Sequence, residues 1–231
     1  MVYFDLEATG LKSSGKPRIT EVSLVAVSKQ DVLDLQKNTI DYIQNRDINI
    51  FQLENLLPRV MNKLTVCIYP MAIIMPQVTD ITGLDNYNLN GHRKFDKETG
   101  NLINQFLARL PSPVCLVAHN GNLYDFPLLK SELEKIGDSL GPEIMCVDSY
   151  IGIKEIFKSI REDDARQYPS SFSLKNLHKH LLGFVPSQSH GAEADCLALL
   201  RTTAMLGKQW LDWMEFNCYK FMDTVGRWGN A

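Results

Sequence analysis

The sequence predicts an α/β fold, a mixed central β-sheet flanked by α-helices, and three observations lead to it. Residues 2–6 and 21–27 are rich in β-branched and aromatic side chains and enclose a turn-forming segment at 10–17, which is typical of a β-hairpin. Residues 64–69 continue this pattern as a third strand. Strand-like and helix-like stretches then alternate, and this order favours a sheet covered by helices.

The later part of the chain supplies the alternation. Its hydrophobic periodicity predicts helices and short buried strands in turn, and residues 210–221 are expected to remain helical. Gly183 and Gly207 stand where glycine commonly ends a helix. The predicted helices cover residues 95–110, 124–136, 173–182 and 192–206, and the strands cover 114–118 and 144–148.

Two segments show no clear period. Residues 29–62 are expected to form a variable excursion between the second and third strands, with a short helix near 51–57. Residues 158–171 are polar and are expected to form a mobile loop. We expect one domain over residues 1–231, because the length suits one α/β core and no linker-like stretch divides it.

Composition excludes several classes of protein. The five cysteines are scattered and odd in number, which indicates neither a disulfide framework nor a zinc site. The chain opens on a strand-like run, and no window approaches the roughly 20 apolar residues of a membrane span, so we expect a protein of the cytoplasm or nucleus without membrane contact. A net charge of −3 disfavours a broad basic surface for duplex DNA, so any nucleic acid must be held locally.

The first motif that indicates chemistry is the run Phe-Asp-Leu-Glu-Ala-Thr-Gly at residues 4–10. Alternate side chains of a strand share a face, so Asp5 and Glu7 project together and repel each other unless a cation or proton neutralises them. Oxygen ligands of this kind suit Mg²⁺ or Mn²⁺. The alternative is a strand whose acids simply reach solvent.

Two further motifs add acids and a base. In the second, a predicted strand leads through His119 and Asn120 into a helix whose first turn holds Asp125, an acid that the helix macrodipole alone could explain. In the third, His190 precedes Asp195 by about one helical turn, so a group that titrates near neutrality stands beside a ligand for a metal. An ordinary capping pair is the competing interpretation.

The three motifs in this order resemble the DEDDh exonuclease superfamily, with Asp5, Glu7, Asp125, His190 and Asp195 in the family positions. Four segments, at residues 4–11, 80–84, 115–121 and 124–129, resemble the three-prime repair exonuclease (Trex) family in their amino-acid sequence, and the likeness covers most of the chain. The resemblance implies an RNase H-like exonuclease fold and a 3′ to 5′ exonuclease that releases nucleoside 5′-monophosphates from the 3′ ends of DNA.

The same resemblance implies roles for the acids and the histidine. Asp5, Glu7 and Asp195 would hold one of two Mg²⁺ ions, for which Mn²⁺ can substitute, and Asp5 and Asp125 would hold the second. His190 would act as the general base toward the attacking water.

The resemblance also implies a set of substrate-binding residues. Leu11 and Ile81 would pack against the terminal base, although they could instead be loop residues that close over the core. Two arginines in the polar loop would contact DNA, although this loop could simply be solvated. The remaining members lie around the acids. The full set is Glu7, Ala8, Leu11, Ile81, His119, Asn120, Tyr124, Arg161 and Arg166.

Partners and alternatives complete the predictions. We expect a homodimer, since pairing of edge strands is a family trait and residues 64–69 match the region concerned. An RNA-trimming exonuclease of the same superfamily is one alternative, because contacts to the 2′-hydroxyl distinguish RNA from DNA and spacing does not reveal them. A catalytically silent nucleic-acid-binding module is another, although all five catalytic positions are filled.

Overall fold

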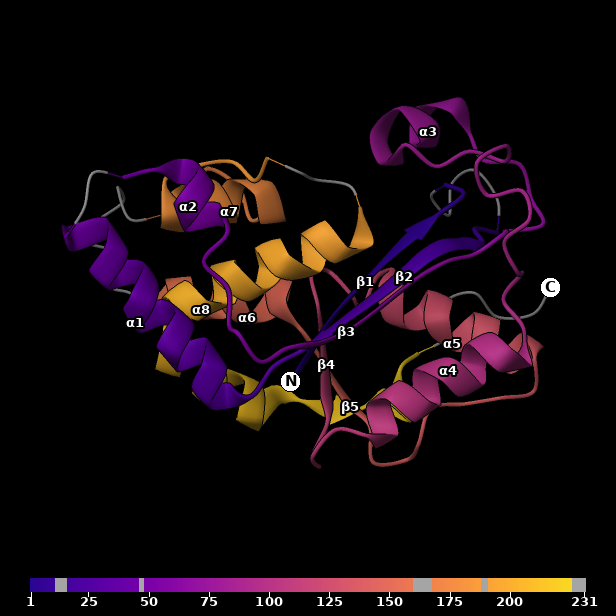
Figure 1. The fold of residues 1–231 in the computed structure, drawn as a ribbon. Helices are drawn as coiled ribbons and strands as arrows, with labels where there is room; N and C mark the ends of the chain where they lie inside the picture. Colours follow the sequence, from indigo (N-terminus) through magenta and orange to yellow (C-terminus); the bar gives the residue numbers. More distant parts are fainter. Residues whose placement is uncertain (11–15, 46–47, 160–167, 188–190, 226–231) are drawn as a thin grey trace.

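A computed structural model of the 231-residue chain describes residues 1–10, 16–45, 48–159, 168–187 and 191–225. Its centre is a six-stranded mixed sheet with the strand order β3-β2-β1-β4-β5-β6 (Figure 1). This confirms the predicted fold class of a mixed sheet flanked by helices. The strands are β1 (Val2–Ala8), β2 (Ile19–Ala26), β3 (Asn62–Cys67), β4 (Cys115–Ala118), β5 (Met145–Asp148) and β6 (Tyr219–Lys220).

The predicted hairpin is present as the antiparallel pair of β1 and β2, in which Asp5 lies opposite Ser23 and Glu7 opposite Glu21. β3 pairs antiparallel with β2, whereas β4 pairs parallel with β1 on its other side. The four residues of β4 are all buried, as expected for a parallel strand covered on both faces. β1 therefore lies inside the sheet, with neighbours on both sides.

Two layers of helices cover the two faces of the sheet (Figure 1). One hydrophobic cluster joins the sheet to α4 (Lys97–Ala108) and α5 (Asp125–Lys135). A second cluster joins the opposite face to four helices, α1 (Lys29–Asn45), α6 (Ser149–Ser159), α7 (Leu174–Leu182) and α8 (Ala192–Asn217).

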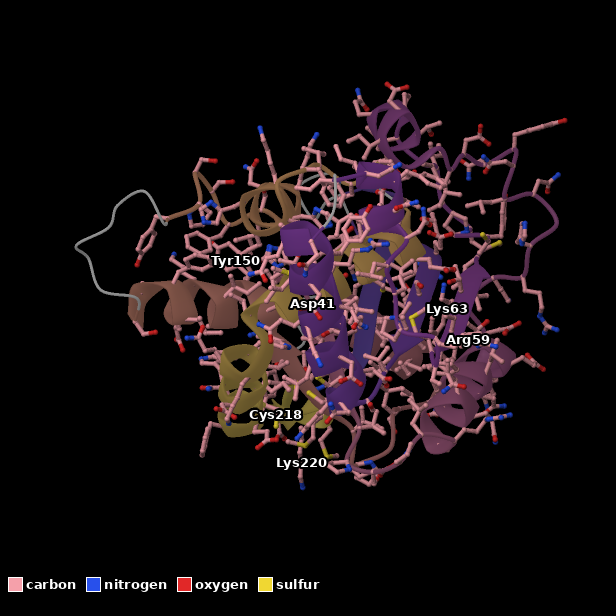
Figure 2. The ribbon with its side chains drawn as sticks, turned by 60° about the vertical axis from the view of Figure 1, so that its left-hand side comes forward. Asp41, Arg59, Lys63, Tyr150, Cys218 and Lys220 are labelled. Carbon is pink, nitrogen blue, oxygen red and sulfur yellow. The ribbon has the colours of Figure 1, made fainter. Side chains whose placement is uncertain are left out.

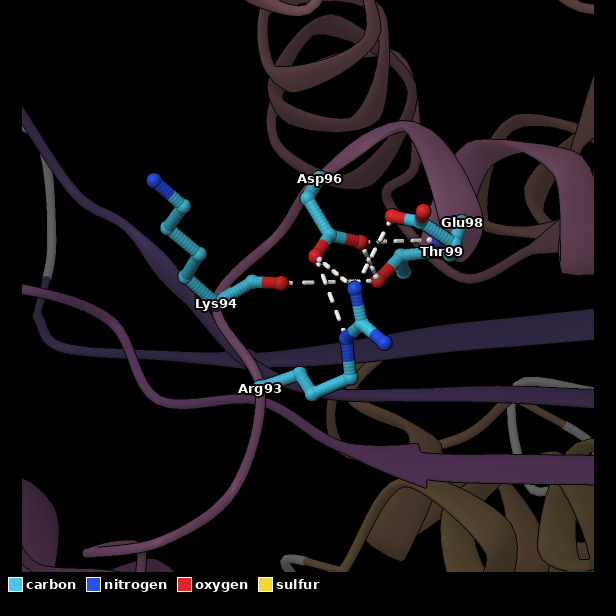
Figure 3. Close-up of polar contacts among 5 residues, drawn as sticks. All are labelled: Arg93, Lys94, Asp96, Glu98 and Thr99. Carbon is cyan, nitrogen blue, oxygen red and sulfur yellow. Dashed lines mark hydrogen bonds and ion pairs between the residues drawn. The ribbon is translucent and has the colours of Figure 1, made fainter.

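Short elements and caps complete the fold. α2 (Ile50–Glu54) lies beside α7, and α3 (Pro76–Thr82) lies beyond the ends of β1 and β2 (Figure 1). Asp96 is the N-cap of α4, and its carboxylate accepts a hydrogen bond from the backbone N–H of Thr99 at 3.1 Å. Arg93 binds both Asp96 and Glu98 at 2.9 Å and holds the chain in place before this helix (Figure 3).

Some predicted elements were wrong. Residues 29–62 hold the 17-residue helix α1, the five-residue helix α2 and the start of β3, not an excursion with one short helix. The C-terminal helix ends at Asn217 and is followed by β6 and by a 3₁₀-helix, Phe221–Asp223, so residues 210–221 are not wholly helical. The predicted helix end at Gly207 is confirmed: its φ of 50° is not helical, and α8 consists of two helices that meet at this kink.

Two further helices, α3 and α6, were not predicted. α6 follows β5 without a spacer and reaches Ser159, so part of the predicted loop at 158–171 is helical and residues 160–167 lie outside the described part of the chain. Within the described ranges, no helix combines the length and the apolar character that crossing a membrane requires. The single domain over residues 1–231 stays a prediction.

Candidate active site

β1 brings two carboxylates to the helix α8 side of the sheet. Val2, Phe4, Leu6 and Ala8 belong to the core under α4 and α5, so the alternation of the strand turns Asp5 and Glu7 to the opposite face. Tyr3 shares that face, and its hydroxyl lies 2.7 Å from the hydroxyl of Thr203 on α8. This buried contact fixes the helix over the strand that carries the acids.

α8 contributes a third carboxylate. Asp195 lies in the first turn of this helix, where its backbone N–H donates to the carbonyl of Gly191 at 3.0 Å. One carboxylate oxygen each from Asp5, Glu7 and Asp195 lies within 4.8 Å of the others, and all three side chains are partly buried. Three of the four predicted metal ligands are thus brought together from the two ends of the sequence.

The charge of Asp195 raises the pKa of both carboxylates on β1. Burial, and then the charges of Asp125, Asp195 and Glu7, raise the pKa of Asp5 well above its ordinary value. Burial, with the charges of Asp195 and Glu21, raises the pKa of Glu7 to about 8. Like charges at this spacing cannot all ionise at neutral pH without a compensating positive charge. A hard divalent cation with oxygen preference meets that need, so the residues present fit a metal ion.

Asp125 stands beside this group at the first residue of α5. Burial is the largest effect on its carboxyl and raises its pKa to about 7, and its charge in turn raises the pKa of Asp5. Among the described residues the close trio is Asp5, Glu7 and Asp195, with Asp125 outside it. Asp125 therefore adds a fourth acid next to Asp5, on the side of the cluster that faces α5.

The turn between β4 and α5, which leads to Asp125, has an uncommon backbone conformation. Asn120 adopts a positive φ of 62°, and a side chain at Gly121 would meet the Cβ atom of Ala118 at 2.6 Å. Asp148, buried at the end of β5, accepts hydrogen bonds from the backbone N–H groups of Asn120 at 2.9 Å and Asn122 at 3.1 Å. The carboxylate thus holds a turn that is far from it in sequence.

Sequence reasoning did not identify Asp148 or Glu21 as site residues. Glu21 lies opposite Glu7 and accepts a hydrogen bond from the backbone N–H of Ala192 at 2.8 Å, which ties β2 to the start of α8. Glu21 could have been identified from its place in the predicted hairpin, where it faces Glu7. Asp148 could have been identified as an acid that directly follows buried strand residues.

His119 and Tyr124 are engaged within the protein. The ring nitrogens of His119 lie 2.9 Å from the Ser149 hydroxyl and 2.8 Å from the Phe172 carbonyl oxygen, and burial lowers the pKa of the ring. The Tyr124 hydroxyl donates to the Gly10 carbonyl at 2.7 Å, linking α5 to the end of β1. Both side chains organise the loops around the acids.

The other predicted substrate residues divide into placed and undescribed ones. Ile81 lies on α3 with 55% of its side chain exposed, and the hydrogen bond from Met75 N–H to the Thr9 carbonyl at 3.4 Å brings this helix to the end of β1. Ala8 is buried in the last position of β1. Four predicted site residues fall outside the described part of the chain, namely Leu11, Arg161, Arg166 and His190.

Comparison with solved structures supports the fold. Exonuclease I of E. coli in complex with a dT13 oligonucleotide superposes with a TM-score of 0.64 over 93% of this chain at 14% sequence identity. This chain spans 42% of the length of that protein. At such low identity the likeness establishes the fold alone.

Comparison with curated proteins is closer in sequence. Three-prime repair exonuclease 1 of Bos taurus is 38% identical over 226 residues, covering 96% of this chain and 68% of the relative. Three prime repair exonuclease 2 of Mus musculus is 32% identical over 216 residues, covering 93% and 86%. A scan against protein-family profiles found no match. From the identity and coverage of these relatives, the chain belongs to the three-prime repair exonuclease family.

Proposed function

We propose that this chain is a metal-dependent 3′ to 5′ exodeoxyribonuclease that releases nucleoside 5′-monophosphates from DNA 3′ ends. The observation that carries the proposal is the convergence of Asp5, Glu7 and Asp195 within 4.8 Å, in a chain that belongs to a family of exonucleases. Both alternatives are disfavoured: the relatives are named for repair and for exonuclease activity, neither for RNA trimming nor for binding alone.

Two divalent ions, Mg²⁺ in the cell, are the proposed cofactors. Asp5, Glu7 and Asp195 would hold one ion, and Asp5 together with Asp125 would hold the other. Bound ions of this kind supply positive charge to the entering and leaving oxygens of a phosphodiester displacement. The raised pKa of Glu7 and of Asp5 supports this assignment, because a cation relieves the repulsion that raises them.

The remaining roles belong to side chains around the acids. His190 would accept the proton of the attacking water, as a general base two residues before α8 begins. Ile81 and Leu11 would pack against the terminal base, and Tyr124 with the main chain of Glu7 and Ala8 would position the last nucleotide. The other proposed DNA contacts are His119, Asn120, Arg161 and Arg166.

A homodimer is part of the proposal. β3 is the outer strand of the sheet, and its residues are exposed or only partly buried. The free edge of an exposed strand can pair with the same strand of a second copy. Sedimentation of the purified chain would give the mass of two copies, and the mass of one copy would exclude the dimer.

The function is tested with 5′-labelled DNA and RNA oligonucleotides of one sequence, incubated with Mg²⁺ or with EDTA. We expect a ladder that shortens from the 3′ end of DNA, absent with EDTA and with Asp195→Asn. Faster shortening of RNA would assign the chain to the RNA-trimming enzymes. Binding of DNA without any cleavage would instead indicate the silent module.

A further inference from the structure

A cavity lies apart from the acidic cluster, on the outer side of α8. It has a volume of about 350 Å³ and lies between α2, β3, the segment after α7 and α8, with Phe51, Glu54, Lys63, Ser187, Leu197 and Arg201 among its lining residues. Leu53, Leu182 and Phe184 form a small hydrophobic cluster that fixes α2 against α7 (Figure 1). The size lies within the range of cavities that hold small ligands.

Arg201 is the unusual member of this wall. Its side chain is only 8% exposed, yet its Nε atom is buried without a hydrogen-bond partner. Burial lowers the pKa of Arg201, which the charge of Glu54 opposes. Enclosing a guanidinium without an acceptor costs stability unless an anion pairs with it. The residue therefore has the character of one half of an ion pair.

The other charged groups at the cavity already have partners. Glu54 accepts a hydrogen bond from the backbone N–H of Ser187 at 2.6 Å. Lys63, which lies on β3 with Arg59 in the segment before it (Figure 2), pairs with Glu193 at 2.9 Å. Among the described residues that line the cavity, Arg201 is therefore the charged group without a hydrogen-bond partner. Its guanidinium favours an oxyanion as the ligand.

An aromatic ring completes the cavity wall. Phe51 lines the cavity with 73% of its side chain exposed, although its helix is anchored by the buried Leu53. An exposed ring on a fixed helix offers a flat apolar surface against which a base can stack. The side-chain amide of Asn55 donates to the Phe51 carbonyl at 2.7 Å, so its own oxygen points elsewhere and can accept a hydrogen bond.

We propose that this cavity binds a nucleoside monophosphate, with the phosphate at Arg201 and the base against Phe51. The choice of this oxyanion rests on the proposed function, because a 3′ exonuclease releases such a nucleotide at every turnover. The cavity and the acids share helix α8: Arg201 lies six residues beyond Asp195. A nucleotide bound here would give the enzyme a second site for its own product.

The test is calorimetric titration of the full chain in EDTA with 2′-deoxyadenosine 5′-monophosphate, with inorganic phosphate and with 2′-deoxyadenosine. We expect the monophosphate to bind, phosphate to compete with it, and the nucleoside to bind at least about tenfold more weakly. Arg201→Met should weaken binding by about tenfold or more, and Arg201→Lys by less, since lysine keeps the charge but loses the planar fork. Arg109→Met, the same change at an exposed arginine outside the cavity, should leave binding unchanged.

Phe51→Ala provides an independent test of the cavity if Arg201→Met does not fold. This exposed ring is not needed for the core, and its loss should weaken binding at least about fivefold. Absence of binding to wild type up to about 10 mM, equal affinity for nucleoside and nucleotide, or unchanged affinity in Phe51→Ala would overturn the site. Since no metal and no cleavage enter the measurement, its failure is separate from failure of the oligonucleotide assay.

Discussion

Glu21 accepts a hydrogen bond from the backbone N–H of Ala192 at 2.8 Å, and so joins the strand opposite Glu7 to the helix that carries Asp195. The backbone N–H groups in the first turn of a helix have no partner within the helix, and this carboxylate satisfies one of them. The bond sets the start of α8 relative to the sheet. Glu21 is therefore a positioning residue for the acidic cluster.

Replacing Glu21 should weaken metal binding. Glu21→Ala removes both the acceptor and a negative charge near the site, and we expect the Mg²⁺ concentration for half-maximal cleavage to rise about 10- to 100-fold. Glu21→Gln keeps an oxygen acceptor and should shift it less. Titration of cleavage with Mg²⁺ measures both, with the exposed Glu98→Ala as control. Equal shifts for the two Glu21 variants would show that the hydrogen bond to the start of α8 does not affect metal binding.

The acids also predict how stability depends on pH. Folding raises the pKa of Glu7 from 4.5 to about 8 and that of Asp5 well above 3.8. A carboxyl with a raised pKa stabilises the fold fully below its ordinary pKa, and this contribution is lost as the pH rises through the folded pKa. Between about pH 5 and about pH 8, metal-free protein should therefore lose on the order of 1 kcal/mol per pH unit.

Urea unfolding with EDTA and with Mg²⁺ tests this dependence. Buried thiols and the tyrosine Tyr3 also have a raised pKa, but they contribute to both series alike. The gap in unfolding free energy between the metal-loaded and metal-free protein should therefore widen as the pH rises, and Asp195→Asn should reduce it. A gap that stays constant over this range would contradict the assignment of the cluster to a metal.

The face of the sheet that carries chemistry could be predicted from local pattern. Alternation along β1 predicted that Asp5 and Glu7 project together, because the pleat is a property of the strand itself. Their meeting with Asp195 depends on contacts between residues remote in sequence, such as Tyr3 with Thr203. Only the family resemblance, and no periodicity, connected these acids.

Helix α1 was not predicted because its hydrophobic pattern is weak. It buries only Val32, Leu35 and Thr39 along 17 residues, so its apolar stripe is narrow. A start signal was nevertheless present: the Ser28 hydroxyl accepts from the Asp31 N–H at 3.0 Å, and the Asp31 carboxylate accepts from the Ser28 N–H at 2.9 Å. β6 spans two residues and carries no period at all, since its place comes from pairing with β5.

Asp148 should prove as important for the site as for stability. Its carboxylate accepts three backbone hydrogen bonds, from Asn120, Asn122 and Tyr150. Asp148→Ala would leave these N–H groups without their acceptor, and we expect a loss of about 2–3 kcal/mol in unfolding free energy. Cleavage should fall as well, because the turn leads directly to Asp125. Denaturant unfolding and the oligonucleotide assay measure the two effects, with the exposed Asp223→Ala as control. Wild-type values for both would remove Asp148 from the site.

Replacing Gly121 tests whether cleavage depends on the close packing of the turn before Asp125. A Cβ atom at this position would lie 2.6 Å from the Cβ of Ala118 on β4 and 2.9 Å from the ring of Phe126 on α5. The Ala118 Cβ is attached to the sheet and cannot swing aside, so the turn itself must shift. We expect Gly121→Ala to cost about 1–3 kcal/mol of stability and to lower cleavage by displacing Asp125.

The same change at Gly191 provides the comparison. A Cβ atom there meets nothing within 4 Å, so Gly191→Ala should cost less than about 1 kcal/mol, the scale of a weakened N-cap. Thermal unfolding of both variants separates steric displacement from the general effect of replacing a glycine. If Gly121→Ala matched Gly191→Ala in stability, the turn would have room to relax and Asp125 would not depend on its packing. If it were less stable but cleaved DNA normally, Asp125 would tolerate displacement, which its proposed place beside Asp5 does not allow.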